Sequence, residues 1–257
     1  MQAIYDIDNK TIDNLLRHRT IREFKPQALP EALVAPLFEA MNRTASSTGM
    51  QQYSVIRVKD EAIRRVLADV AKQEYMLRAP ELVIFIVDLY RNNKIAEMNG
   101  ARVIAGDTMD AFFQGYSDAL LAAQTLNTAV EAAGLGAVYF GSILNDPARV
   151  IEALKLPRLT FPVLGLGFGE INQRPELKPR LPLAQKLFDD TYTALDVDAE
   201  ALAAYDSEMT GYYDLRDSNR RVDSFSKQVV ARLNTVNEKR QRMLQVVAAQ
   251  GFRLMTE

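Results

Sequence analysis

The segment from His18 to Arg22 brings an imidazole, a hydroxyl and two guanidiniums together within a short stretch of chain. In an extended backbone alternate residues point to the same side, so His18, Thr20 and Arg22 can converge on one anion. The alternative is a solvated charged loop after a short helix. Taken alone, the segment favours that plainer interpretation.

Two further segments carry groups that suit an oxygen-rich or anionic ligand. The loop at residues 45–52, ASSTGMQQ, offers consecutive hydroxyls and backbone N–H groups, although a plain turn would have the same composition. Lys178 and Arg180 flank a proline that holds the backbone extended. Their two cations match a phosphate or a carboxylate, but such tripeptides are common on protein surfaces.

The composition limits which chemistry side chains can perform. The chain has 257 residues, no Cys, no Trp and one His. The lack of Cys excludes disulfides, iron–sulfur clusters, thiolate zinc and a cysteine nucleophile. A single His excludes a His-rich metal site within one chain, while a carboxylate Mg²⁺ or Ca²⁺ site stays open. We therefore expect an organic cofactor to supply any difficult chemistry.

Charge and hydropathy indicate where the protein works. The formal net charge of −2 argues against nucleic acid bound by bulk electrostatics. The first residues lack the basic start and the apolar core of a signal peptide. The longest strongly apolar run, Leu82–Val87, is too short to span a bilayer. We expect a cytoplasmic protein without a nucleic-acid or membrane partner.

Hydrophobic periodicity predicts the elements that must position these groups. Apolar runs that alternate or continue predict strands at residues 53–59, 82–88, 137–143 and 161–169. Helical spacing predicts helices at residues 61–72, 107–133, from 146–147 onward, 198–207 and 226–250. Because strands and helices interleave, the class is α/β or α+β with a central sheet.

Two details of this pattern bear on function. The helix at 107–133 is apolar on most of its circumference, so it is buried centrally or in a subunit interface. The glycines at 134 and 136 follow a helix, and those at 165, 167 and 169 lie within a strand. We interpret them as a helix C-cap and strand glycines, because a dinucleotide-binding motif follows a strand and opens a helix.

Five motifs in order resemble the flavin-dependent nitroreductase family: HRTIREF, ASSTGMQQ, Gln73-x-Tyr75, GLGAVYFGSI and KPR. The resemblance runs from about Thr11 to Arg180. The chain length and the stretch from Tyr212 to Arg221 are most similar to the NADPH-preferring subgroup. That subgroup includes the oxygen-insensitive nitroreductases and the NADPH flavin reductases.

The resemblance implies an α+β fold of the three-layer α/β/α type, with a central, mostly antiparallel sheet flanked by helices. It implies an obligate homodimer with FMN in sites lined by both subunits. Residues 1–182 would form the FMN-binding core. Residues 183–257 would form a helical C-terminal extension that completes the core and carries the dinucleotide-binding loop.

The resemblance also implies roles for single residues, with the chemistry on N5 of FMN and no catalytic side chain. His18 and Thr20 would lie near the phosphate, and Arg22 near the pyrimidine edge as an electrostatic stabiliser. The other implied FMN contacts are Ser47, Thr48 and Gly49 from the partner subunit, Gln73 and Tyr75 on the pyrimidine side, Gly141 and Ser142 near N5, and Lys178 and Arg180 on the phosphate. Arg216, with Arg220 or Arg221, would bind the 2′-phosphate of NADPH. Gly49 and Ser142 depart from the family pattern, which has Ser and Gly there.

The function implied is an FMN-dependent NADPH oxidoreductase that reduces nitroaromatics, quinones or similar acceptors by ping-pong two-electron transfer. One alternative is an NADPH flavin reductase that releases reduced FMN to a partner. A second, from another class, is a flavin store or sensor without turnover. Residues 211–242 hold eight Lys/Arg against four acids, which suits a phosphorylated dinucleotide or, beyond Arg221, a solvated helix face.

Overall fold

The computed structural model describes residues 9–192, 199–212 and 223–254. The chain divides into two units, which are described separately. The first comprises residues 1–173 and 237–257, and the second comprises residues 174–236. The division of function between residues 1–182 and 183–257 stays a prediction.

Four antiparallel strands form the sheet of the first unit, in the order β1-β2-β4-β3. Their bounds are Tyr53–Arg57 (β1), Glu81–Asp88 (β2), Gly136–Phe140 (β3) and Thr160–Gly169 (β4). Every residue of β2 is buried, as expected for a continuous apolar run in a central strand. The four predicted strands are confirmed, except that β1 ends at Arg57 and β3 ends at Phe140, where a 3₁₀ turn begins.

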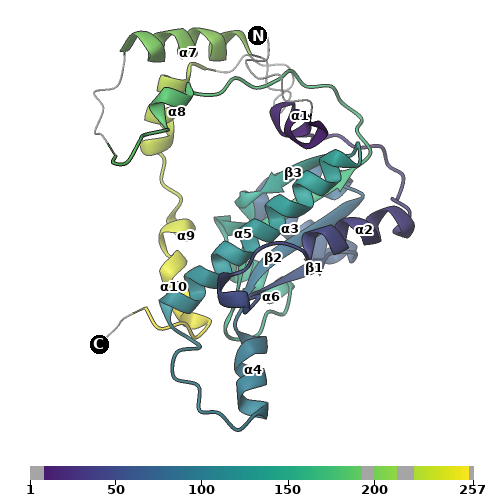
Figure 1. The fold of residues 1–257 in the computed structure, drawn as a ribbon, viewed down its shortest axis with the longest axis vertical. Helices are drawn as coiled ribbons and strands as arrows, with labels where there is room; N and C mark the ends of the chain where they lie inside the picture. The colour runs from purple at the N-terminus through teal and green to yellow at the C-terminus, as the bar shows by residue number, and fades with distance from the viewer. Residues whose placement is uncertain (1–8, 193–198, 213–222, 255–257) are drawn as a thin grey trace. The chain divides into compact units, whose positions relative to one another are not determined.

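Helix α5, Met109–Ala132, crosses one face of this sheet (Figure 1). Its Phe112 ring lies 5.7 Å from Phe161 of β4. The helix ends in a Schellman motif: Leu135 N–H donates to the Val130 carbonyl, and Gly134 takes a φ of 77°. The predicted helix and its glycine cap are confirmed.

The opposite face is covered by shorter elements. Phe140 points to that face, and the ring of Tyr75 packs on it at 5.6 Å. The remaining elements of the unit are α1 (Lys10–Leu16), α2 (Glu31–Met41), η1 (Ser47–Gly49), α3 (Glu61–Ala71), η2 (Glu74–Arg78), α4 (Tyr90–Met98), η3 (Gly141–Asn145), α6 (Pro147–Ala153), α9 (Glu238–Gln241) and α10 (Met243–Ala249). The fold is α+β with helices on both faces of an antiparallel sheet, in agreement with the predicted class.

The strand glycines of β4 serve packing. A Cβ on Gly167 would lie 2.9 Å from the Ala79 side chain, and one on Gly169 would lie 2.6 Å from Pro80. These positions therefore have no room for a side chain, and they open no helix. The interpretation as strand glycines is confirmed.

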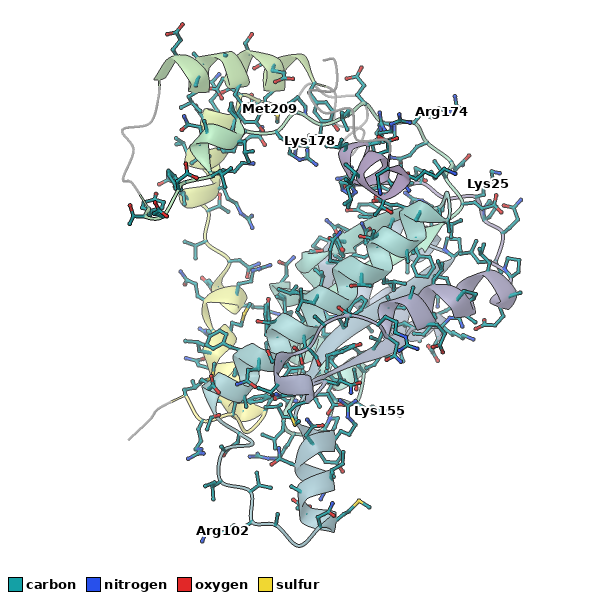
Figure 2. The ribbon with its side chains drawn as sticks, in the orientation of Figure 1. Lys25, Arg102, Lys155, Arg174, Lys178 and Met209 are labelled. Carbon is teal, nitrogen blue, oxygen red and sulfur yellow. The ribbon has the colours of Figure 1, made fainter. Side chains whose placement is uncertain are left out.

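Helix α4 was not predicted from the sequence. It follows β2 directly, and Figure 1 shows it projecting away from the sheet with the loop after it. Arg102 marks the far part of that loop in Figure 2. The helix has no buried residue, so it lacks the apolar stripe from which an amphipathic helix is predicted.

The second unit pairs α7, Ala199–Gly211, with α8, Phe225–Leu233, and holds a 3₁₀ turn, η4, at Leu183–Gln185. The rings of Tyr205 and Phe225 lie 5.2 Å apart, and Asp206 accepts the Ser226 N–H at 2.9 Å. The prediction of one helix over 226–250 is wrong. The helix stops at Leu233, and the Asn237 side chain caps a new helix by accepting the Arg240 N–H at 3.2 Å. No helix of the described residues is long and apolar enough to cross a bilayer.

Asp69 should make stability depend on acid pH. Its carboxylate accepts from Lys72 at 2.7 Å and from Arg149 of α6 at 2.8 Å, and these contacts lower its pKa to about 2. A depressed pKa adds stability above the unfolded-state value of about 3.9. That contribution is lost as the pH falls towards 2. We expect Asp69→Asn to lower the urea midpoint at pH 6 and to match the wild type near pH 2. A difference that is the same at both pH values would contradict this linkage.

Candidate cofactor site

The segment 18–22 runs along the open edge of β3. Thr20 pairs with Ala137 in a parallel bridge, and the Ile21 N–H donates to the Ala137 carbonyl at 2.9 Å. The Ile21 side chain is buried beside Gly136, where a Cβ would lie 2.6 Å from it. Because alternate residues of an extended segment face opposite sides, Thr20 and Arg22 point away from Ile21. The bridge at Thr20 shows that the backbone is extended there, which the predicted convergence of side chains requires.

His18 is held by a residue that the sequence analysis missed. Its Nδ1 lies 2.6 Å from Oε1 of Glu131, near the end of α5. A carboxylate only accepts, so Nδ1 donates and Nε2 is the ring nitrogen turned to other partners. Burial, with the nearby Glu131 charge, raises the pKa of Tyr139. Its hydroxyl stays protonated and donates to the Ala123 carbonyl at 3.1 Å.

The loop around Ser47–Gly49 is pinned to α5 by a second missed residue, Asp118. The carboxylate accepts the Ser47 N–H at 2.7 Å and the Gln52 N–H at 3.0 Å. Asp118 has no exposed surface and lies in the middle of an apolar helix. A buried acid in such a helix needs donors, which is the signal that could have revealed it.

The loop itself has an unusual backbone. Thr48, Gly49 and Gln51 all have positive φ values, of 51°, 72° and 50°. A non-glycine residue in this region is strained, and it persists only where its surroundings fix it. The Asp118 contacts on both sides of the turn provide that fixation. The loop therefore presents its hydroxyls and N–H groups in one conformation.

Gln73, Tyr75, Gly141 and Ser142 meet at the end of β3. The Ser142 hydroxyl donates to Oε1 of Gln73 at 2.8 Å. Tyr75 packs on Phe140, the last residue of the strand before Gly141. Two motifs that lie far apart in the sequence thus form one polar group.

The returning C-terminal segment braces this strand end. Lys239 pairs with Asp146, directly after η3. Arg240 Nη1 donates to the Gly141 carbonyl and to Oδ1 of Asn145, both at 3.3 Å. These two cations of the positive 211–242 stretch therefore contact the η3 region, and the Lys239 side chain is also 64% exposed to solvent.

The other predicted cations belong to the second unit. Figure 2 labels Lys178 on the stretch that precedes α7. Arg180 donates to the Lys178 carbonyl at 2.8 Å, and the Tyr205 hydroxyl donates to the Pro179 carbonyl at 3.4 Å, so the tripeptide has a defined backbone. Arg216, Arg220 and Arg221 lie outside the described residues.

The first unit offers what an anionic organic cofactor would need. It combines Arg22, an imidazole, the hydroxyls of the Ser47–Gly49 loop and the start of a 3₁₀ turn, whose first N–H groups have no partner inside the turn. Gln173 adds a buried Nε2 with no hydrogen-bond partner among the described residues. It follows Asn172, whose N–H donates to the carbonyl of Glu23, the residue after Arg22. Buried donors are normally paired, so this one fits a ligand acceptor.

Comparison with known proteins identifies the family of this chain. A model described as "Nitroreductase family" matches residues 15–170, and one for the "Nitroreductase family, C-terminal domain" matches residues 178–255. An NADPH-dependent oxidoreductase of Staphylococcus saprophyticus is 34% identical over 244 residues, covering 93% of this chain and 96% of that protein. The oxygen-insensitive NADPH nitroreductase of Salmonella typhimurium is 33% identical over 246 residues, covering 94% and 98%. The structure of the NADPH:FMN oxidoreductase from Vibrio harveyi complexed with NAD⁺ matches with a TM-score of 0.84 at 31% identity, covering 96% and 100%.

The chain belongs to the nitroreductase family. This confirms the family that the five ordered motifs indicate, and with it the prediction of an NAD(P)H-dependent oxidoreductase. The roles of the individual site residues stay predictions.

Proposed function

We propose that the protein is an FMN-dependent NADPH oxidoreductase that reduces nitroaromatics, quinones or similar acceptors in a ping-pong cycle. The observation that carries the proposal is the group at the end of β3. There, Gln73, Tyr75, Gly141 and Ser142 come together, and the edge of the same strand holds Thr20. The names of the relatives support both the flavin and the reduced nicotinamide.

In this proposal the chain binds and orients the cofactor. In the first unit, His18 and Thr20 would contact the phosphate, and Arg22 would contact the pyrimidine edge. Lys178 and Arg180 of the second unit are proposed as further phosphate ligands. A guanidinium placed at the pyrimidine edge would stabilise negative charge that develops on that edge during reduction. When bound, FMN would supply two-electron redox chemistry, which no side chain of this chain can provide.

The site is proposed to need two copies of the chain. Helix α5 buries one side, but Phe113, Leu120 and Leu121 on the other side are 61%, 40% and 47% exposed. An exposed group of large apolar side chains on one face of a helix is typical of a subunit interface. The Ser47–Gly49 loop packs on the same helix, so a partner docked there would receive this loop in its site.

Two cavities of the first unit lie away from the proposed flavin site. One of about 640 Å³ lies beside Arg57 and Glu81, and one of about 680 Å³ lies beside Tyr90 and Arg158. Neither cavity is lined by a residue of the proposed flavin site.

Reduced nicotinamide is proposed to bind through Arg216 with Arg220 or Arg221, which suit the 2′-phosphate of NADPH.

A second candidate function is an NADPH flavin reductase that releases reduced FMN. The similarity to the NADPH:FMN oxidoreductase of Vibrio harveyi favours it specifically. Rapid exchange of bound FMN with free flavin would distinguish this role. A cytoplasmic location also stays a prediction.

Stopped-flow absorbance tests the function directly. The purified protein should be yellow, and NADPH should bleach the bound flavin faster than NADH. Nitrofurazone or a quinone should then restore the colour. Protein that fails to take up added FMN would contradict the proposal. Flavin that no nicotinamide bleaches would favour the store or sensor, and equal rates with NADPH and NADH would remove the role of the arginine cluster.

A further inference from the structure

We infer that Arg240 is a positioning residue that orients the peptide between Gly141 and Ser142 towards the flavin. The inference rests on the proposed function, because it assumes FMN at the end of β3. Arg240 lies in the segment that follows the second unit in sequence and belongs to the first unit. The argument has three steps, each from a contact of the described residues.

The first step is the geometry of the peptide. Arg240 Nη1 donates to the Gly141 carbonyl at 3.3 Å. None of the described peptide bonds is cis, and in a trans peptide the C=O and the following N–H point in opposite directions. Holding the Gly141 carbonyl on the Arg240 side therefore turns the Ser142 N–H to the opposite side. That N–H opens a 3₁₀ turn, so it needs an acceptor from outside the turn.

The second step fixes the neighbouring amide. Oε1 of Gln73 can only accept, so the Ser142 hydroxyl is the donor in their 2.8 Å contact. This leaves the Gln73 NH₂ group directed away from Ser142, as a donor for another acceptor. Ser142, which departs from the family pattern, thus selects one of the two orientations of the Gln73 amide. Arg240 and Ser142 together present an ordered pair of donors.

The third step concerns charge. A cation on the carbonyl side polarises the peptide and makes the opposite N–H a stronger donor. A stronger donor favours the more negative, reduced form of a flavin over the oxidised form. Arg240 is therefore expected to raise the midpoint potential of bound FMN and to tighten its binding.

Lys239 provides a matched control. It is the preceding residue of α9, carries the same charge and also contacts the η3 region, through Asp146. No contact joins it to the Gly141 peptide among those of the described residues. Removing Lys239 therefore removes one charge and one anchor of α9, but leaves the peptide held.

The test measures FMN affinity by fluorescence quenching and the midpoint potential by redox titration, with folding checked by circular dichroism. For Arg240→Ala we expect the dissociation constant to rise about tenfold and the potential to fall. Arg240→Lys should restore part of both, and Lys239→Ala should stay near the wild type. Equal changes in Arg240→Ala and Lys239→Ala, or no change in Arg240→Ala, would overturn the inference.

Two outcomes separate this inference from the function on which it rests. Wild-type protein that takes up no FMN would overturn the proposed function as well. Should Arg240→Ala fail to fold, Ser142→Ala carries the test, because it removes only the hydroxyl that orients Gln73. We expect weaker FMN binding at unchanged thermal stability, and unchanged affinity in that variant would contradict the ordered pair of donors.

Discussion

Asp118→Ala is expected to destabilise the protein by about 3 kcal/mol, since two backbone donors lose a charged acceptor. For a chain of this size that corresponds to a fall of roughly 6–12 °C in Tm. The Ser47 and Gln52 N–H groups would lose their partner, and the Gln52 N–H lies in a buried contact. The variant should also bind FMN more weakly, because the loop loses its fixed conformation.

The second effect follows from the backbone of the loop. Thr48 and Gln51 hold positive φ values that cost free energy, and the Asp118 contacts offset that cost. Without the carboxylate the loop relaxes to ordinary φ values, and its hydroxyls no longer face one ligand together. Thermal unfolding and FMN titration of the same protein sample measure the two effects.

Asp110 supplies the control. It lies in the first turn of α5, is exposed, and among the described residues its carboxylate accepts from Gln114 at 2.8 Å. Asp110→Ala loses a favourable helix-dipole interaction, worth about 0.5 kcal/mol at an exposed site. If Asp118→Ala changes Tm no more than Asp110→Ala does, the loop is not held by this carboxylate.

The fold could be predicted where a local pattern decides it. The continuous apolar run of β2 and the long pattern of α5 both correspond to the observed elements within a few residues. The helical spacing over 226–250 predicted one helix, but it continues across the break between Leu233 and Glu238. Asn237 caps a new helix there. Helix α4 escaped prediction because its stability does not come from a buried stripe.

The site was predictable in its motifs but not in its supports. Short sequence segments reveal His18, the Ser47 loop and Gln73, since their residue types carry the chemistry. Their partners lie far along the chain: Glu131 is 113 residues from His18, and Asp118 is 71 residues from Ser47. Only the folded sheet and α5 bring these groups together, so no local spacing encodes the pairs.

A charge on the open side of α5 is expected to have the other large effect. In Phe113→Asp combined with Leu121→Asp, two carboxylates replace side chains that are 61% and 47% exposed in one chain. If this face is the subunit interface, the carboxylates would be buried without partners, and burial of an unpaired charge is strongly unfavourable. We expect a folded monomer by light scattering, with FMN affinity reduced about a hundredfold, or about 2.7 kcal/mol.

The loss of FMN follows from the division of the site between subunits. A monomer would keep His18, Arg22 and the Gln73 group but would lack the Ser47–Gly49 loop of its partner. Met98→Asp is the control, because Met98 is 85% exposed at the end of α4, and a charge there meets solvent. A double variant that stays dimeric would place the interface elsewhere. A monomer that retains FMN at wild-type affinity would show that one subunit forms the whole site.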